Sequence, residues 1–176
     1  MYNKTLFTSF RPPNNSNNHH NSNHNDHHND DHHNNNNNNN NNDNDDYIKD
    51  YGKEPLVIDI EKVTKANNAF RRALWTGDKL QITLMSIKTD IGLEMHRNTD
   101  QFLKVEEGFG TVVMGKNRNN LNKKYNIQKD TAIVIPAGTW HNIYSNGKTP
   151  LKLYSIYAPP QHKKGTLQWT KKDSQR

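Results

Sequence analysis

Short runs of alternating apolar and polar residues, separated by Gly, Asn and Pro, follow one another from Leu56 to Tyr157. In the clearest run, Leu80–Ile87, positions 80, 82 and 84 are apolar and share one face of a strand, because side chains two residues apart point the same way. No segment shows the convincing helical period of an amphipathic helix. Two prolines, Pro159 and Pro160, end the last run because proline donates no ladder hydrogen bond.

The predicted strands are Leu56–Ile60, Arg72–Trp75, Leu80–Ile87, Leu93–His96, Gln101–Val105, Thr111–Met114, Tyr125–Ile127, Ala132–Ile135, His141–Ser145 and Leu151–Tyr157. About ten short strands spaced by turns predict an all-β sandwich or barrel. The residues after Pro160 are expected to form a loose arm that packs on the barrel or on a neighbouring molecule.

Residues 14–46 break this pattern, because they are almost entirely Asn, His and Asp, with an unbroken Asn run from Asn34 to Asn42. So little apolar surface cannot offset the entropy of ordering. Residues 1–46 are therefore predicted to be a disordered low-complexity tail, and residues 47–176 a single folded domain. Seven of the ten histidines lie in the tail, where they are expected to bind metals only incidentally.

Charge is distributed unevenly between these two parts. The tail has two basic residues against six aspartates, a net charge of −4, and the domain has 22 basic against 12 acidic residues, a net charge of +10. The basic residues form no stripe interleaved with aromatic residues, so a solvated surface is favoured over a nucleic-acid site. The absence of cysteine excludes disulfides and thiolate ligands. No membrane span or secretory signal is predicted, and the cytoplasm is the default location.

Side chains of metal-ligand type gather in Gly92–His96, which runs on to Gln101, and in Pro136–His141. Glu94 and His96 point together in a strand, and the turn that follows returns Gln101 beside His96. The Pro136–Gly138 turn delivers His141. Two imidazoles and one carboxylate suit divalent Fe, Mn, Co, Ni or Zn, with Gln101 as a weaker fourth ligand. Two alternatives stay open: Glu94 acts as a catalytic general base, or the four side chains hydrogen-bond one another without a metal.

These two segments resemble the two motifs of the cupin superfamily, and the resemblance covers roughly residues 54–160. It implies a double-stranded β-helix, or jelly-roll barrel, with both motifs at one end. In the usual first motif, His-x-His is followed by Glu, and Glu94, His96 and Gln101 take these places here. Asp130 stands where the family usually has glycine.

Four segments look like a subgroup of small single-domain cupins similar to the cupin domain of type II mannose-6-phosphate isomerases: Phe70–Gly77, Leu80–Ile87, Ile91–His96 and Leu151–Pro160. In that subgroup Glu94 and Gln101 look like normal working residues. The resemblance does not establish isomerase activity. The first hypothesis is a metal-dependent enzyme that acts on a sugar, a sugar phosphate or another oxygen-rich metabolite. The alternative is a metal-free, non-catalytic cupin that binds a small ligand. A homodimer is expected, because small cupins commonly pair.

Several other residues are expected to have structural rather than functional roles. His162 lies among lysines and is expected to be exposed, and Arg71 and Arg72 are expected to form a basic edge facing solvent rather than to reach an acidic ligand. Trp140 is expected in the core or at a pocket rim. Four aromatic residues are expected to leave apolar surface that a small barrel does not cover: Phe7, Phe70, Trp75 and Trp169.

Overall fold

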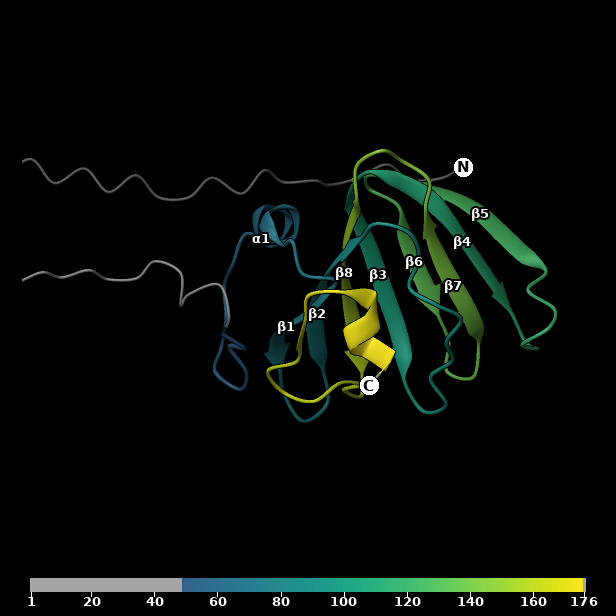
Figure 1. The fold of residues 1–176 in the computed structure, drawn as a ribbon. Helices are drawn as coiled ribbons and strands as arrows, with labels where there is room; N and C mark the ends of the chain where they lie inside the picture. Colours follow the sequence, from purple (N-terminus) through teal and green to yellow (C-terminus); the bar gives the residue numbers. More distant parts are fainter. Residues whose placement is uncertain (1–48, 176) are drawn as a thin grey trace, which may run out of the picture. The chain divides into compact units, whose positions relative to one another are not determined.

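The computed structural model describes residues 49–175, and the predicted tail at 1–46 lies outside the described residues. Two antiparallel sheets make up most of the described part (Figure 1). The larger sheet has the strand order β6-β3-β8-β2-β1-β9, and the smaller has the order β5-β4-β7. This is the all-β architecture that the strand pattern predicted and the jelly roll that the resemblance implied, so the fold class is confirmed.

The strands are β1 Arg71–Thr76, β2 Gln81–Ile87, β3 Asp100–Glu107, β4 Phe109–Gly115, β5 Lys123–Gln128, β6 Ala132–Ile135, β7 Trp140–Ser145, β8 Leu151–Ala158 and β9 Leu167–Gln168. Most lie within one or two residues of their predicted bounds. The predicted strand Leu93–His96 was wrong, because this segment is irregular and meets β7 only through a single bridge between Glu94 and His141.

The first predicted strand, Leu56–Ile60, was wrong. The chain there is irregular and then enters helix α1, Ile60–Ala66. Asp59 caps this helix, because its side chain accepts a hydrogen bond of 3.0 Å from the backbone N–H of Lys62. A capping aspartate with Glu61 in the first turn and Lys65 in the last favours a short helix, and these signals outweigh the apolar alternation before it.

The interior of the larger sheet is divided into an apolar layer and a polar layer. Along β8 the interior positions are Leu151, Leu153, Ser155 and Tyr157, each 0% exposed. The first two belong to the hydrophobic core that both sheets share, whereas the last two carry hydroxyl groups. Burying polar groups at one end of a small barrel costs free energy unless they form hydrogen bonds or bind a ligand. This polar end is therefore the candidate location of a functional site.

The same change from polar to apolar side chains runs across three neighbouring strands. Tyr157 pairs with Gln101 of β3 on one side and with Gln81 of β2 on the other. Both glutamines are almost completely buried. The next two positions along β3 toward the apolar layer are Leu103 and Val105, which lie in the core. The strand register therefore puts a row of buried polar side chains at one end of the sheet.

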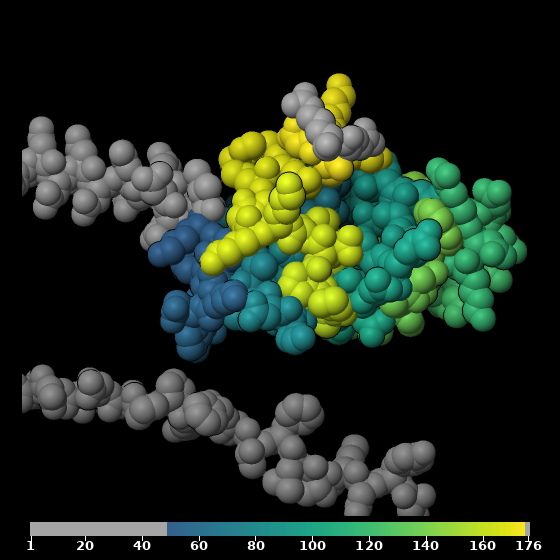
Figure 2. Space-filling view, turned by 90° about the horizontal axis from the view of Figure 1, so that it is seen from below, coloured from purple at the N-terminus to yellow at the C-terminus, as the bar shows by residue number. Residues whose placement is uncertain are grey.

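The C-terminal segment forms an arm that packs on the barrel, which is one of the two arrangements expected from the sequence. Its residues, in yellow in Figure 2, spread over the face of the molecule seen from below. The arm adds β9 to the edge of β1 and then forms a short 3-10 helix, η2, Lys171–Gln175. Gln81 anchors its start by accepting a 2.9 Å hydrogen bond from His162 N–H and donating one of 2.9 Å to His162 C=O.

The packing corrects the expectation for Phe70 and agrees with the one for Trp169. Phe70 is 4% exposed and lies in the core, so it offers no uncovered surface, whereas Trp169 is 62% exposed. Phe7 lies outside the described residues. Within residues 49–175 the structure has no helix long and apolar enough to cross a membrane.

Candidate metal centre

Backbone contacts tie the two ligand-bearing segments together. Glu94 and His141 exchange two backbone hydrogen bonds of 3.0 Å, so the two chains run side by side at this point. The N–H of Gly138 donates to His96 C=O at 2.8 Å, and the N–H of Ala137 donates to the Asp100 carboxylate at 2.8 Å. Gly138 has a φ of +76°, a conformation that glycine adopts at no steric cost. The turns predicted from the sequence thus hold the two segments in register.

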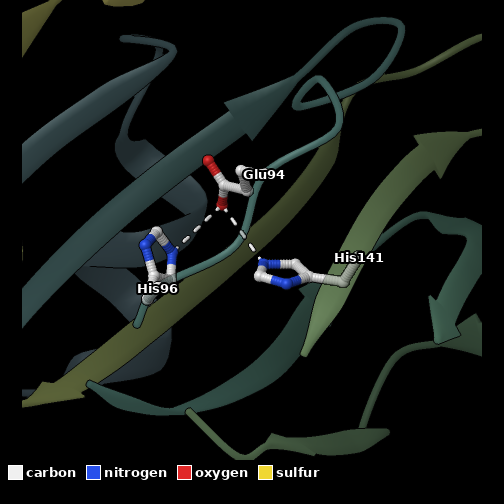
Figure 3. A group of neighbouring side chains, drawn as sticks. All are labelled: Glu94, His96 and His141. Carbon is white, nitrogen blue, oxygen red and sulfur yellow. Dashed lines mark ion pairs between the residues drawn. The ribbon is translucent and has the colours of Figure 1, made fainter. Parts of the chain in front are cut away.

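Glu94, His96 and His141 form a compact cluster of donor atoms (Figure 3). Their ligand atoms all lie within 4.8 Å of one another. The Oε1 of Glu94 is 3.4 Å from His96 Nε2 and 3.3 Å from His141 Nε2. His141 is 0% exposed and His96 is 7% exposed, whereas the Glu94 side chain is 24% exposed. Three of the four side chains that the sequence analysis singled out therefore meet, and Glu94 lies nearest to solvent.

His141 is held in one orientation by its own turn. Its Nδ1 lies 3.0 Å from the carbonyl oxygen of Thr139. A carbonyl oxygen only accepts hydrogen bonds, so Nδ1 carries a proton. In the neutral ring Nε2 then bears a lone pair, and this lone pair faces the Glu94 carboxylate, which is also an acceptor. Two acceptors 3.3 Å apart repel each other unless a cation lies between them or the ring is protonated.

The electrostatic surroundings keep the Glu94 carboxyl ionised. Burial raises its pKa, but hydrogen bonds that His141 and His96 donate in their protonated form, together with the Arg71 guanidinium, outweigh burial and hold the pKa well below its ordinary value. The Nη2 of Arg71 lies 3.8 Å from Glu94 Oε2. A carboxylate that stays charged is a strong ligand for a divalent cation and a weak base.

Gln101 lies in the polar layer, 2% exposed. Its Nε2 lies 2.9 Å from the Ser155 hydroxyl and 3.2 Å from the Tyr157 hydroxyl and donates to them. These contacts leave the amide oxygen buried with no hydrogen-bond partner. The rings of His96 and Tyr157 meet edge to face at 5.6 Å, so the row that contains Gln101 borders the histidines. The ligand role of Gln101 stays a prediction.

Arg71 was misjudged from the sequence. Instead of facing solvent it is 3% exposed, and Arg72 is 8% exposed. Arg71 is the first residue of β1 and reaches the polar layer beside Glu94. Its Nη1 donates to the Gln168 side chain of β9 at 3.0 Å. Sequence analysis could not find this contact, because it depends on the C-terminal arm, which has no motif.

His162 was also expected to be exposed, and this was wrong. Its ring meets Tyr157 edge to face at 5.1 Å, and its Nε2 is buried without a hydrogen-bond partner. Burial, with a smaller effect of Arg71, lowers the pKa of His162 to about 3, although Glu94 acts in the opposite direction. Its ring is therefore neutral at physiological pH. Trp140 is half-buried with the Arg118 guanidinium 5.7 Å from its ring, a position at the rim rather than in the core.

Residues 82–157 match the cupin domain family, the segment that carries Glu94, His96, Gln101 and His141. The chain belongs to the cupin superfamily. The match begins in β2 and ends in β8, so this cupin's helix α1 and its C-terminal arm lie outside the matched segment.

Known relatives extend the similarity beyond that segment. The cupin is 58% identical over 129 residues to YrkC of Bacillus subtilis (strain 168), an uncharacterised protein, with 72% of this chain and 69% of that protein covered. It is 38% identical over 114 residues to the uncharacterised protein L612 of Acanthamoeba polyphaga mimivirus, covering 63% and 69% of the two chains.

Among solved structures, BH2720 from Bacillus halodurans is 58% identical, with a TM-score of 0.72, and the match covers 73% of this chain and 98% of that one. TT1209 from Thermus thermophilus has a TM-score of 0.50 at 17% identity, covering 58% and 96%, and shares the fold alone. None of these four names states an activity.

Proposed function

We propose that this cupin holds a divalent metal ion through the Glu94 carboxylate and the Nε2 atoms of His96 and His141, and acts on a small oxygen-rich metabolite. The observation that carries the proposal is the opposition of the His141 Nε2 lone pair and the Glu94 carboxylate at 3.3 Å inside the barrel. A cation between these atoms turns their repulsion into attraction. Gln101 is the candidate for an additional neutral ligand.

The spacing of the donor atoms supports a metal rather than a hydrogen-bonded cluster. Two donors that bind one ion at ~2.1 Å with an angle of roughly 90–109° lie ~3.0–3.4 Å apart. The Glu94–histidine distances are 3.3 and 3.4 Å. A hydrogen bond between an imidazolium and a carboxylate is shorter, about 2.7–2.9 Å. All three donor atoms are also buried without hydrogen-bond partners, as expected for an unfilled ligand set.

A metal at this position supplies a Lewis acid for a carbonyl, hydroxyl or carboxylate oxygen. The histidines orient the centre, because His141 is fixed by Thr139 and His96 is packed against Tyr157. Tyr157 and the core close the inner side of the site against water. Sugar or sugar-phosphate isomerase activity is the finer form of the proposal. It rests on the resemblance to mannose-6-phosphate isomerase-like cupins.

The second candidate function is a metal-free cupin that only binds a ligand. The observation in its favour is the charge balance between Glu94 and Arg71, which leaves the cluster without net charge when both imidazoles are neutral. A balanced pair of this kind is tolerated in a protein interior without a metal.

Metal analysis of the full-length chain separates the two functions. The seven tail histidines are first replaced by Asn, which preserves the chain length and removes a competing source of metal binding. Co²⁺ or Mn²⁺ is then titrated, and the bound metal is counted after desalting. We expect about one ion per chain in this background, most of it lost in His96→Ala and His141→Ala. His162→Gln is the matched control and should retain the metal. Equal metal content in all four proteins overturns the proposal.

The expected homodimer stays a prediction. It is supported by an apolar strip on the outer side of the larger sheet, lined by Val57, Ile58, Trp75, Leu80, Ile82 and Ile156 among others. A cytoplasmic location and the absence of nucleic-acid and membrane partners likewise stay predictions from the sequence.

A further inference from the structure

Arg71 is a buried cation that the metal site does not explain. Its side chain is 4% exposed, in a layer of the barrel that otherwise contains hydroxyls, amides, imidazoles and one carboxylate. Burial of a guanidinium costs free energy unless its N–H groups form hydrogen bonds or its charge is balanced by an anion. Arg71 pays this cost beside the Glu94 carboxylate, so a cation at this interior position indicates a requirement of the site.

The hydrogen-bond donors of Arg71 are only partly used. Its Nη1 donates to Gln168 at 3.0 Å. Its Nη2 is 3.8 Å from Glu94 Oε2, which is beyond hydrogen-bond distance. Its Nε is buried and has no hydrogen-bond partner. The Nε and Nη2 groups lie on one edge of the planar guanidinium and present two parallel N–H bonds, the arrangement that binds a carboxylate in a bidentate manner.

Gln168 determines which edge of Arg71 is free. It belongs to β9, and its side-chain oxygen occupies Nη1 on the other side of the guanidinium. The ring of Phe70 lies 5.3 Å from the Arg71 guanidinium carbon and supports the group from one face. With one donor engaged by the C-terminal arm and one face covered, the Nε–Nη2 edge is fixed beside Glu94.

The charge of the loaded site also requires an anion. With a divalent ion bound, the metal contributes +2, Glu94 −1 and Arg71 +1, while the imidazoles, Gln101 and Tyr157 are neutral. The net charge of +2 is buried in a region of low dielectric, so an anionic ligand binds there more favourably than a neutral one. This step rests on the proposed metal site.

We propose that Arg71 anchors the carboxylate of a small organic acid whose second oxygen, on the neighbouring carbon, reaches the metal. The guanidinium and the two histidines flank the same Glu94 carboxylate, with Arg71 beside Oε2 and the histidines beside Oε1. The anchor and the metal site are thus separated by about the width of one carboxyl group. A 2-hydroxy or 2-oxo acid has two oxygen-bearing groups at this spacing, and Glu94, as the most exposed member of the cluster, marks its entrance.

Glycolate titration tests the proposal, because glycolate has a carboxylate and a hydroxyl on neighbouring carbons. The protein is the Co²⁺-loaded full-length chain with the tail histidines replaced by Asn. Binding is measured by calorimetry and by the Co²⁺ absorption spectrum. Glycolamide is the neutral match, and inorganic phosphate tests for a tetrahedral anion. The variants are Arg71→Gln, Arg71→Lys and, as a matched loss of one surface charge, Arg97→Gln, whose residue is exposed.

We expect glycolate to bind more tightly than glycolamide and phosphate. Loss of the charge-assisted bidentate contact should weaken glycolate binding by about ten- to a hundredfold in Arg71→Gln. Arg71→Lys keeps the charge but lacks the two-donor edge, so it should bind glycolate less tightly than the unsubstituted protein while it keeps its metal. If Arg71→Gln does not fold, the glycolate affinity of Arg71→Lys alone tests the role of Arg71. Arg97→Gln should behave like the unsubstituted protein.

The inference is overturned if the Arg71 substitutions leave glycolate affinity unchanged. It is also overturned if glycolamide or phosphate binds as tightly as glycolate. A chain that takes up no Co²⁺ overturns the proposed metal function instead. The same titration on the metal-free chain then decides the role of Arg71, because Arg71→Gln must still reduce glycolate binding there.

Discussion

The Nδ1 atom of His141 lies 3.0 Å from the carbonyl oxygen of Thr139, two residues earlier in the same turn. This contact fixes the proton on Nδ1 and turns the Nε2 lone pair toward Glu94. The Pro136–Gly138 turn therefore does more than reverse the chain. It sets the tautomer of the one ligand-type side chain in the centre that is 0% exposed.

Substitution of Gln101 should change metal affinity in opposite directions. Gln101→Ala should weaken metal binding only a few-fold, because an amide oxygen is a poorer ligand than imidazole. Gln101→Glu should tighten it by about tenfold through the added charge. The Ser155 and Tyr157 hydroxyls, which now accept from the amide, can donate to the new carboxylate. Metal affinity is measured by competition with a chelator.

Asn126→Asp is the matched control for Gln101→Glu. It makes the same change from amide to carboxylate on β5 of the other sheet, at an exposed position. If Asn126→Asp raises metal affinity by the same factor, the effect of Gln101→Glu comes from long-range charge. Gln101 is then not a ligand of the metal centre.

The strand pattern predicted most of the fold because residues Leu151 to Tyr157 and their neighbours alternate with period two. The convergence of Glu94, His96 and His141 followed from the same alternation and from two turns that proline and glycine mark in the sequence. Asp130 illustrates a local rule: it stands where a glycine is usual and has a φ of +69°, a conformation that aspartate tolerates better than most residues.

The sequence could not predict the positions of Arg71 and His162, because both depend on the C-terminal arm. The arm adds β9 to β1, which places Gln168 against Arg71, and Gln81 binds the backbone of His162. These contacts join residues more than 80 positions apart in the chain and leave no periodic pattern. Helix α1 was missed for a different reason, since a seven-residue helix is too short to show a helical period.

Gln81→Leu should detach the C-terminal arm. The Gln81 side chain is 0% exposed and satisfies both the N–H and the C=O of His162. Each of these two buried backbone groups costs about 1–3 kcal/mol when left unpaired, so the free energy of unfolding should fall by ~2–6 kcal/mol. Amide exchange in residues 161–168 should become faster than in β8. Gln161→Leu, at the exposed neighbouring position, is the control. Unchanged protection of the arm in Gln81→Leu would show that other contacts hold it.

A homodimer should use the apolar strip on the outer side of the larger sheet. Ile58 is 37% exposed and Leu80 is 36% exposed, and both line that strip. Sedimentation of the full-length chain at micromolar concentration should give about twice the monomer mass. Ile58→Asp with Leu80→Asp should give the monomer, because two charges in an apolar interface are costly. Val134→Asp, at an exposed position of β6, is the control and should remain dimeric. A monomeric unsubstituted chain would reject the prediction.

His162 should make the stability of the fold depend on pH. Its ordinary pKa of 6.5 falls to about 3 in the folded protein, chiefly through burial. Above pH 6.5 the ring is neutral in both states and contributes no pH dependence. As the pH falls from about 6.5 toward 3, the unfolded chain binds a proton that the folded protein does not, so the free energy of unfolding decreases. One such proton gives a slope of at most about 1.4 kcal/mol per pH unit.

Replacing the imidazole should remove this contribution. His162→Gln should flatten the pH dependence of the free energy of unfolding between about pH 6.5 and pH 3, measured by urea unfolding. Comparison with the unsubstituted chain cancels the titration of the carboxylates and of the other histidines. The same substitution at His24, in the Asn- and His-rich segment, is the matched control, for which no change of slope is expected. If both substitutions leave the slope unchanged, His162 takes up its proton in the folded state as readily as in the unfolded chain, and the neutral buried ring is wrong.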